Sequence, residues 1–241
     1  MYIDILLIGF NKTKEKEMDL INVNYVICMF LGYLVGTINP SYLFALKKGF
    51  DIRERGSGNA GASNAVITMG KDVGILCILL DILKSYGIVK ITTYVFANSP
   101  HSFVITSSAC ILGHVFPFHM KFRGGKGLAC MGGSLLAYSP IIFIKILIVG
   151  ATLTFLVGYI CVLPISASIL LPVLYGFAEK DLIGMSMLMF VGAIIIWRHK
   201  ENLIRIKNGS EMRLSYIWDK EKELERLMEV HEEESSKARG I

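Results

Sequence analysis

The chain has 241 residues and a formal net charge of +5, and 53% of its residues are hydrophobic, with a mean hydropathy of +0.54. Its apolar residues gather in long uncharged runs, among them the 22 residues of 25–46 and the 33 residues of 146–178. An uncharged run of about 18 residues can cross a bilayer, and a helical run satisfies its own backbone hydrogen bonds there. The composition therefore excludes a water-soluble globular domain and predicts an all-α, polytopic membrane protein.

Charge and cysteine usage exclude further classes. No long basic or aromatic-interleaved stretch lies outside the apolar runs, so no nucleic acid is expected as a partner. The five cysteines are scattered, without a Cys-x-x-Cys pair, and predict neither a disulfide framework nor a zinc site.

The first predicted elements are an extension over residues 1–24 and spans at about 25–46, 73–96 and 102–118. The extension is too short in its apolar part to span and lacks the features of a signal peptide. Lysine and arginine follow the first and third spans and the last apolar run, whereas the loop between the second and third spans has neither. By the positive-inside rule, the basic loops and the C-terminus face the cytoplasm from the cell membrane.

The stretch 128–197 must cross the membrane an even number of times to keep the basic loops on one side. As a helix it would be about 105 Å long, against a hydrocarbon core of roughly 30 Å. Breaks are available near 139–140, 158–164 and 179–181. Four short crossings fit best, which predicts seven spans in all, with five as the alternative.

The C-terminal residues 212–241 follow the membrane domain, which we place at 25–211. They form a strongly charged tail with Leu224, Leu227 and Met228 at helical spacing. This pattern predicts a solvated amphipathic helix on the cytoplasmic side, with a partner-binding helix as the alternative.

Three polar islands interrupt the apolar runs: island one (53–64), island two (113–127) and island three (198–211). Island one contains Gly56-x-Gly58-x-x-Gly61, which formally matches a dinucleotide fingerprint. That motif needs a strand and a βαβ unit, and here it lies between membrane helices. A flexible backbone leading into a helix N-terminus is suited to binding an anion. Ser57 and Asn59 add a hydroxyl and an amide group that can hydrogen-bond to it. The alternative is a turn that merely joins two spans.

Island two contains Gly124-Gly125-Lys126-Gly127, which is not a Walker A motif because Gly127 stands where Ser or Thr is required. Glycines let backbone N–H groups approach an anion, and Lys126 supplies charge. A lysine at this depth can also be a membrane-surface anchor, but its three flanking glycines favour substrate contact. His114, in an apolar context, is predicted to be a structural hydrogen-bonding residue.

Island three places His199, Asn202 and Arg205 at successive spacings of three, which puts them on one helix face. A ring nitrogen, an amide and a guanidinium on one face form a plausible wall for a phosphate-bearing substrate. The alternative is an interfacial helix end that Gly209 terminates. Within the second span, Asp81 and Lys84 are predicted to form a local ion pair.

Taken together, the islands resemble the bacterial acyl-phosphate:glycerol-3-phosphate acyltransferases, the PlsY family, over roughly residues 25–211. The resemblance implies a seven-span helical bundle that transfers a fatty acyl group from acyl phosphate to the 1-hydroxyl of glycerol 3-phosphate. Lysophosphatidic acid and phosphate would be the products, and no metal or other cofactor would be needed.

The resemblance also assigns residues. Those expected to act in catalysis are Ser57, Lys126, His199 and Asn202. Those expected to bind the substrates are Arg53, Gly56, Ser57, Gly58, Asn59, Gly124, Gly125, Lys126, Arg205 and Glu211. Gly124 and Gly125 would offer backbone N–H groups, and Glu211 would support or position its neighbours.

One position departs from the family pattern. The family has arginine three residues after the asparagine of its first motif, and this chain has Ile67 there, three after Asn64. An isoleucine cannot replace a bidentate phosphate contact, although Arg53 or Arg205 could compensate. Two alternatives to the acyltransferase therefore stay open at this point: a catalytically silent paralog and a transporter of a phosphorylated solute.

Overall fold

A computed structural model of the protein describes residues 23–217 and 219–239, so most of the predicted extension lies outside the described residues. The chain divides into two compact units, Met1–Pro140 and Ile141–Ile241. Helices make up nearly all the regular structure of both units, and the described residues include only one isolated β-bridge, between Tyr159 and Arg213.

The first unit begins with a broken helix. Residues 23–37 are helical, and α2 (Pro40–Lys47) continues after Asn39, whose side chain accepts a hydrogen bond from Tyr42 N. Proline is suited to the first helical position because its missing N–H has no partner there in any case. The remaining long helices are α4 (Lys71–Val95), α5 (Ser102–Val115) and α6 (Leu128–Tyr138), with the short α3 (Ala62–Met69) before them.

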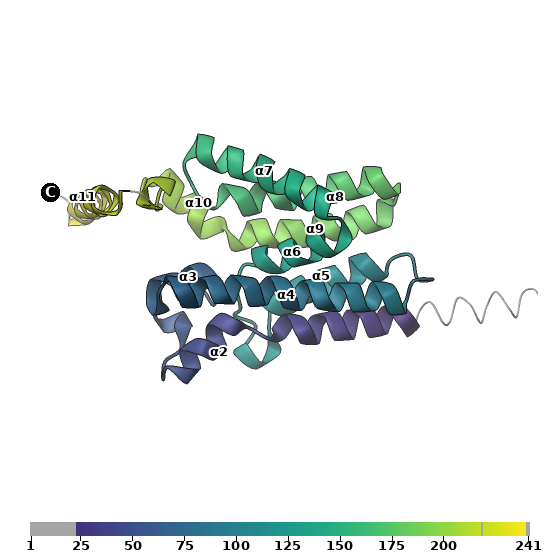
Figure 1. Ribbon diagram of the computed structural model, residues 1–241. Helices are drawn as coiled ribbons and strands as arrows, with labels where there is room; N and C mark the ends of the chain where they lie inside the picture. The colour runs from purple at the N-terminus through teal and green to yellow at the C-terminus, as the bar shows by residue number, and fades with distance from the viewer. Residues whose placement is uncertain (1–22, 218, 240–241) are drawn as a thin grey trace, which may run out of the picture. The chain divides into compact units, whose positions relative to one another are not determined.

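Helix α4 is the centre of the first unit and packs against α2, α3, α5 and α6 (Figure 1). Close contacts are made over glycines. A side chain at Gly133 of α6 would overlap the carbonyl of Ile82, and one at Gly36 would overlap the carbonyl of Cys110. Small residues at such crossings allow the backbones of membrane helices to approach.

The second unit contains α7 (Pro140–Val157), α8 (Val162–Glu179), α9 (Leu182–Arg198), α10 (Lys200–Lys207), a 3-10 turn η3 (Leu214–Ile217) and α11 (Lys220–Arg239). Figure 1 shows α8 and α9 side by side, joined by a tight turn. Asp181 forms that turn: its carboxylate accepts from Gly184 N at 2.9 Å and from the Tyr175 hydroxyl at 3.1 Å.

The helices confirm the predicted all-α membrane architecture, including the breaks between α6 and α7, α7 and α8, and α8 and α9. Among the described residues, four segments are long and apolar enough to cross a membrane, or five if α9 and α10, bent by 46°, form one span. Those four are Val23–Lys47, Ser102–Met120, Pro140–Val157 and Val162–Glu179. The predicted span at 73–96 corresponds to α4, which is not one of these four. Seven crossings require that α4 and α6 span as well, whereas the alternative of five keeps α4 and has two crossings over 128–197.

Candidate functional site

Island one is organised by a single buried amide, that of Asn64 in α3. Its side chain is fully buried, and the two hydrogens of its Nδ2 are shared among the carbonyls of Ile52 (2.9 Å), Arg55 (2.9 Å) and Asn59 (3.0 Å). Its Oδ1 accepts from the backbone N–H of Ser57 at 2.8 Å. The loop therefore wraps around Asn64. Asn64 lies within the first motif but was not among the predicted site residues, although an asparagine just after the glycine-rich loop, at the start of a predicted helix, was visible in the sequence.

The glycines of island one give the loop its shape. Gly56 and Gly58 have backbone φ angles of 58° and 70°, which residues other than glycine rarely adopt. At Gly56 a Cβ would also overlap Asn64 Oδ1. Ser57 and Gly58 are exposed, so this part of the loop faces outward. Gly61 is the N-cap residue of α3 and gives the helix no side-chain cap, which leaves first-turn N–H groups for another acceptor.

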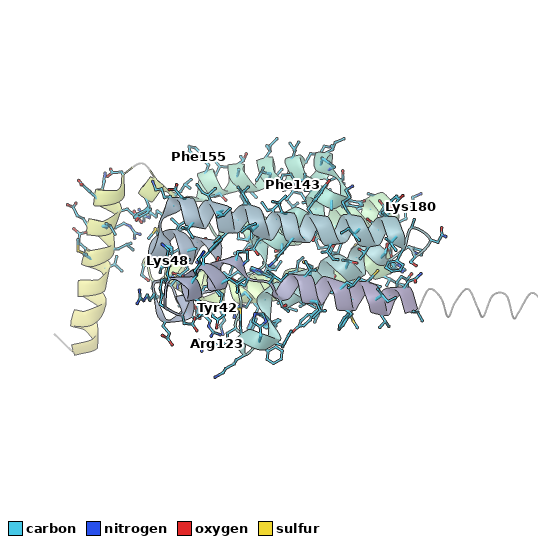
Figure 2. The ribbon with its side chains drawn as sticks, turned by 60° about the horizontal axis from the view of Figure 1, so that its bottom comes forward. Tyr42, Lys48, Arg123, Phe143, Phe155 and Lys180 are labelled. Carbon is cyan, nitrogen blue, oxygen red and sulfur yellow. The ribbon has the colours of Figure 1, made fainter. Side chains whose placement is uncertain are left out.

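Arg53 joins islands one and two. Its guanidinium makes paired hydrogen bonds to Asp51, at 2.9 and 2.6 Å, and donates to the carbonyl of Met120 at 2.6 Å. It also stacks over the ring of Tyr42, 5.0 Å from the centroid. The hydrogen bonds from Arg53 hold the pKa of Asp51 below its ordinary value. Arg53 thus has a structural role, and its predicted contact with substrate stays a prediction. Figure 2 labels Tyr42, which belongs to α2, and Arg123, which belongs to island two.

Island two folds back on the end of α5. After two left-handed residues, Lys121 and Phe122, Gly124 N donates to Val115 O at 3.0 Å and Gly125 N to His114 O at 3.1 Å. These two N–H groups are therefore used inside the fold, contrary to the expectation that they would face an anion. The reason for glycine is steric: a Cβ at position 124 would overlap the carbonyl of His114, and one at 125 would overlap its ring.

This close packing sets the position of Lys126. The residue is half-buried and stands two residues before α6, whose N-cap Gly127 has φ of 91° and provides no side-chain cap. A lysine beside an uncapped helix N-terminus combines a full positive charge with the partial charge of the helix dipole. The predicted anion-binding chemistry thus rests on Lys126 and the N-terminus of α6.

A buried polar cluster stands behind island two. Lys84 Nζ lies 2.7 Å from Asp81 Oδ1 and 3.1 Å from His114 Nδ1, and it donates to the carbonyls of Gly36 (3.0 Å) and Ile38 in the broken first helix. The predicted ion pair between Asp81 and Lys84 is confirmed. His114 is nearly fully buried and makes the structural contacts predicted for it.

The same cluster has the chemistry of a metal site. Ligand atoms of Asp81, His114 and Cys130 lie within 4.8 Å of one another, and no other such group occurs in the described part of the chain. The ammonium of Lys84, in contact with the Asp81 carboxylate, already provides the positive charge that a metal ion would bring. These residues therefore do not fit a metal ion alongside Lys84.

Island three forms a connected set in the second unit. Asn202 Nδ2 and Arg205 Nε each donate to one oxygen of Glu211 at 2.6 Å, and both Asn202 and Glu211 are buried. His199, the N-cap residue of α10, is also buried, and its Nδ1 lies 2.8 Å from the carbonyl of Ile195. Because a carbonyl only accepts, Nδ1 carries the hydrogen and Nε2 carries the lone pair of a neutral imidazole.

The structure thus brings islands one and two together in the first unit and places island three in the second. The assembly of all three into one site stays a prediction. Their common feature is local: each leads into a helix whose N-terminus has no side-chain cap, namely α3, α6 and α10.

Comparison with known proteins shows one family. The family model described as glycerol-3-phosphate acyltransferase matches residues 26–209. The glycerol-3-phosphate acyltransferase of Bacillus velezensis is 35% identical over 193 residues, which cover 79% of this chain and 98% of that protein. That of Thermotoga petrophila is 38% identical over 191 residues, 77% of this chain and 94% of that protein.

Two solved structures are also similar. The crystal structure of PlsY, an integral membrane glycerol 3-phosphate acyltransferase, in its glycerol 3-phosphate form is 33% identical, with a TM-score of 0.72 over 80% of this chain and 96% of that chain. The lysophosphatidic acid form gives 32% identity and a TM-score of 0.69, covering 78% of this chain and 94% of that chain. The chain described here therefore belongs to the glycerol-3-phosphate acyltransferase (PlsY) family and is a multi-pass membrane enzyme of that family.

Proposed function

We propose that this enzyme transfers a fatty acyl group from acyl phosphate to the 1-hydroxyl of glycerol 3-phosphate, at the cytoplasmic face of the cell membrane. The observation that carries the proposal is the similarity to PlsY structures in glycerol 3-phosphate and lysophosphatidic acid forms, which cover 80% and 78% of the chain. All three islands begin within the residues that match the family, and this match favours an enzyme over a transporter.

The reaction needs little covalent help from the protein. An acyl phosphate is a mixed anhydride, so the glycerol hydroxyl oxygen attacks the acyl carbon, the new ester bond forms, and the bond to the phosphate oxygen breaks. The protein must position the hydroxyl and neutralise clustered negative charge. Lys126 at the N-terminus of α6, and the uncapped N-terminus of α3 beside Ser57, are suited to the two phosphate groups.

Two groups can accept the proton of the attacking hydroxyl. One is His199 Nε2, because the contact of Nδ1 with Ile195 O fixes the tautomer that leaves the lone pair on Nε2. The other is the departing phosphate. The side chain of Asn202 is held by Glu211, so it offers a fixed amide to orient the glycerol.

Asn59 and Arg205 are the polar groups proposed to complete the acceptor site. The Oδ1 atom of Asn59 is buried without a hydrogen-bond partner in the described structure, which suits it to accept from a glycerol hydroxyl. Ile67 is 59% exposed on α3, and its side chain has no charge or hydrogen-bond donor for a phosphate. All three guanidinium nitrogens of Arg53 donate to Asp51 or Met120, whereas Arg205 pairs with Glu211 through Nε. We therefore assign the compensating cation to Arg205, whose side chain is 38% exposed.

The test is an assay of the purified protein in lipid with palmitoyl phosphate and glycerol 3-phosphate, following phosphate and lysophosphatidic acid together. We expect both products from the wild type and a loss of at least a hundredfold in Lys126→Ala, since removing a charge-stabilising group costs about that much. Lys121→Asn is the matched control, because it also removes one positive charge from island two and asparagine tolerates the left-handed backbone there.

The outcomes separate the components of the proposal. Turnover with palmitoyl-CoA but not with palmitoyl phosphate would refute the donor. A folded wild type that binds glycerol 3-phosphate without forming either product would refute the reaction and identify a binding-only member of the family. An equal loss in Lys126→Ala and Lys121→Asn would refute the specific role of Lys126.

A further inference from the structure

The C-terminal helix α11 lies wholly outside residues 26–209, the part of the chain that matches the family. It nevertheless makes specific contacts with the rest of the second unit, of which it is a part. The segment that leads to it pairs Leu214 N with Gly158 O at 2.7 Å, and Arg213 forms a β-bridge with Tyr159. Figure 1 shows α11 beyond α10, at the C-terminal end of the chain.

Two residues of α11, Glu223 and Arg226, anchor the helix. Glu223 is 4% exposed, and its carboxylate accepts from Arg213 N at 2.9 Å and from the Ser215 hydroxyl at 3.2 Å. It also pairs with Arg226 at 2.5 Å. Burial alone would raise the pKa of Glu223, but the hydrogen bonds from Arg226 and Arg213 hold it below its ordinary value, so the carboxylate stays charged at neutral pH.

The rest of the Arg226 guanidinium points into island three. Nη1 donates to Gly209 O at 2.5 Å and Nη2 to Glu211 O at 2.8 Å. These carbonyls flank the turn that follows α10, in which Glu211 N also donates to Arg205 O at 3.1 Å. The backbone of Glu211 is therefore held on one side by α11 and on the other by α10.

That backbone carries the side chain on which island three depends. The two oxygens of Glu211 receive Asn202 and Arg205, each at 2.6 Å. A shift of the Gly209–Glu211 turn would move the carboxylate and release both side chains. Polar groups act effectively in catalysis only when held close to their productive geometry.

We propose that α11 is a positioning element of the acyltransferase, in which Arg226, oriented by Glu223, fixes Glu211 and through it Asn202 and Arg205. The inference rests on the proposed function for the role of island three. It assigns the charged tail a task in the active enzyme, while most of the described residues of α11 remain exposed, as the sequence predicted.

The experiment uses full-length protein in lipid and three variants: Arg226→Ala, Arg226→Lys and Lys222→Ala. Lys222 is exposed on the same helix. Its replacement by alanine therefore removes one positive charge but leaves the contacts of Arg226 with the Gly209–Glu211 turn in place. Backbone amide exchange over residues 208–213 reports on the turn directly, and kcat and KM for glycerol 3-phosphate report on its consequence.

We expect Arg226→Ala to speed exchange at Ser210 and Glu211 at least tenfold and to lower kcat/KM by about tenfold, mainly through KM, with α7–α9 exchanging as in the wild type. Arg226→Lys should give an exchange rate and a kcat/KM between those of the wild type and Arg226→Ala. An ammonium cannot hold two carbonyls and a carboxylate with the geometry of a planar guanidinium. Lys222→Ala should match the wild type in both measurements.

If Arg226→Ala left amide exchange at Ser210 and Glu211 unchanged, the claim that Arg226 holds the Gly209–Glu211 turn would be refuted, whatever the activity. Faster exchange with unchanged kcat/KM would overturn its role in positioning. If the wild type itself fails to turn over palmitoyl phosphate and glycerol 3-phosphate, the proposed function has failed, and the exchange measurement still decides whether Arg226 holds the turn.

Discussion

Replacement of Asn64 by alanine tests whether the order of island one is needed to bind the phosphate. From a fully buried position, its Nδ2 shares two hydrogens among three backbone carbonyls, and its Oδ1 accepts from Ser57 N, which amounts to about three hydrogen bonds. Each such bond contributes about 1 kcal/mol net. The exposed part of the loop can be rehydrated when they are lost, so we expect a cost of about 2–3 kcal/mol.

That free energy must be recovered whenever substrate reorders the loop. At about 1.4 kcal/mol for each factor of ten, the cost corresponds to a rise in KM for glycerol 3-phosphate of about 30- to 150-fold. Asn64→Asp is the informative second variant. It keeps the acceptor for Ser57 N but turns a carboxylate oxygen toward three carbonyls, so its loss should be at least as large.

The assay is phosphate release by purified protein in lipid at varied glycerol 3-phosphate, with thermal unfolding measured on the same samples to confirm that the membrane helices remain folded. Ser63→Ala is the control, since Ser63 is the exposed neighbour of Asn64 in α3. If Asn64→Ala and Ser63→Ala both kept a KM within twofold of the wild type, the loop would not need Asn64 and the reasoning would be refuted.

Three further changes have defined outcomes. His199→Ala should lower kcat by about a hundredfold if the imidazole is the base; a kcat near that of the wild type would assign the proton to the departing phosphate. Ile67→Arg, at an exposed position of α3, should lower KM for glycerol 3-phosphate by about three- to tenfold through a new charged contact, and an unchanged KM would show that this position does not face the phosphate. Gly125→Ala should cost about 1–3 kcal/mol of stability, because its methyl group overlaps the His114 ring; a wild-type melting temperature and turnover would contradict the tight packing of island two.

Local rules fixed the elements of this protein because they act within a few residues. Long uncharged runs can only be helices in lipid, and the breaks at Pro140, Gly158 and Asp181 follow from residues that end or start helices, whose effect does not depend on the rest of the chain. The three islands and their helix-leading glycines were equally visible, because polar residues stand out against an apolar chain.

The partners of the polar groups could not be predicted in the same way, since they come from distant parts of the chain. Arg53 donates to a carbonyl 67 residues away, and Lys84 reaches carbonyls 46 and 48 residues before it. Only tertiary packing decides such pairs, because a guanidinium or ammonium carries no information about which carbonyl will lie beside it.

The glycines of island two and the charged tail show the same limit most clearly. The residue types at 124 and 125 correctly indicated a close approach, but the fold turns their N–H groups to Val115 and His114 and not outward. Likewise, the charges of α11 predicted a solvated face. The structure shows that one of these charged side chains, Arg226, donates to the carbonyls of Gly209 and Glu211. The sequence by itself determined which groups are available and where helices begin and end; the tertiary structure decided which of these groups are already satisfied within the protein, because desolvation and hydrogen-bond geometry depend on what packs against them.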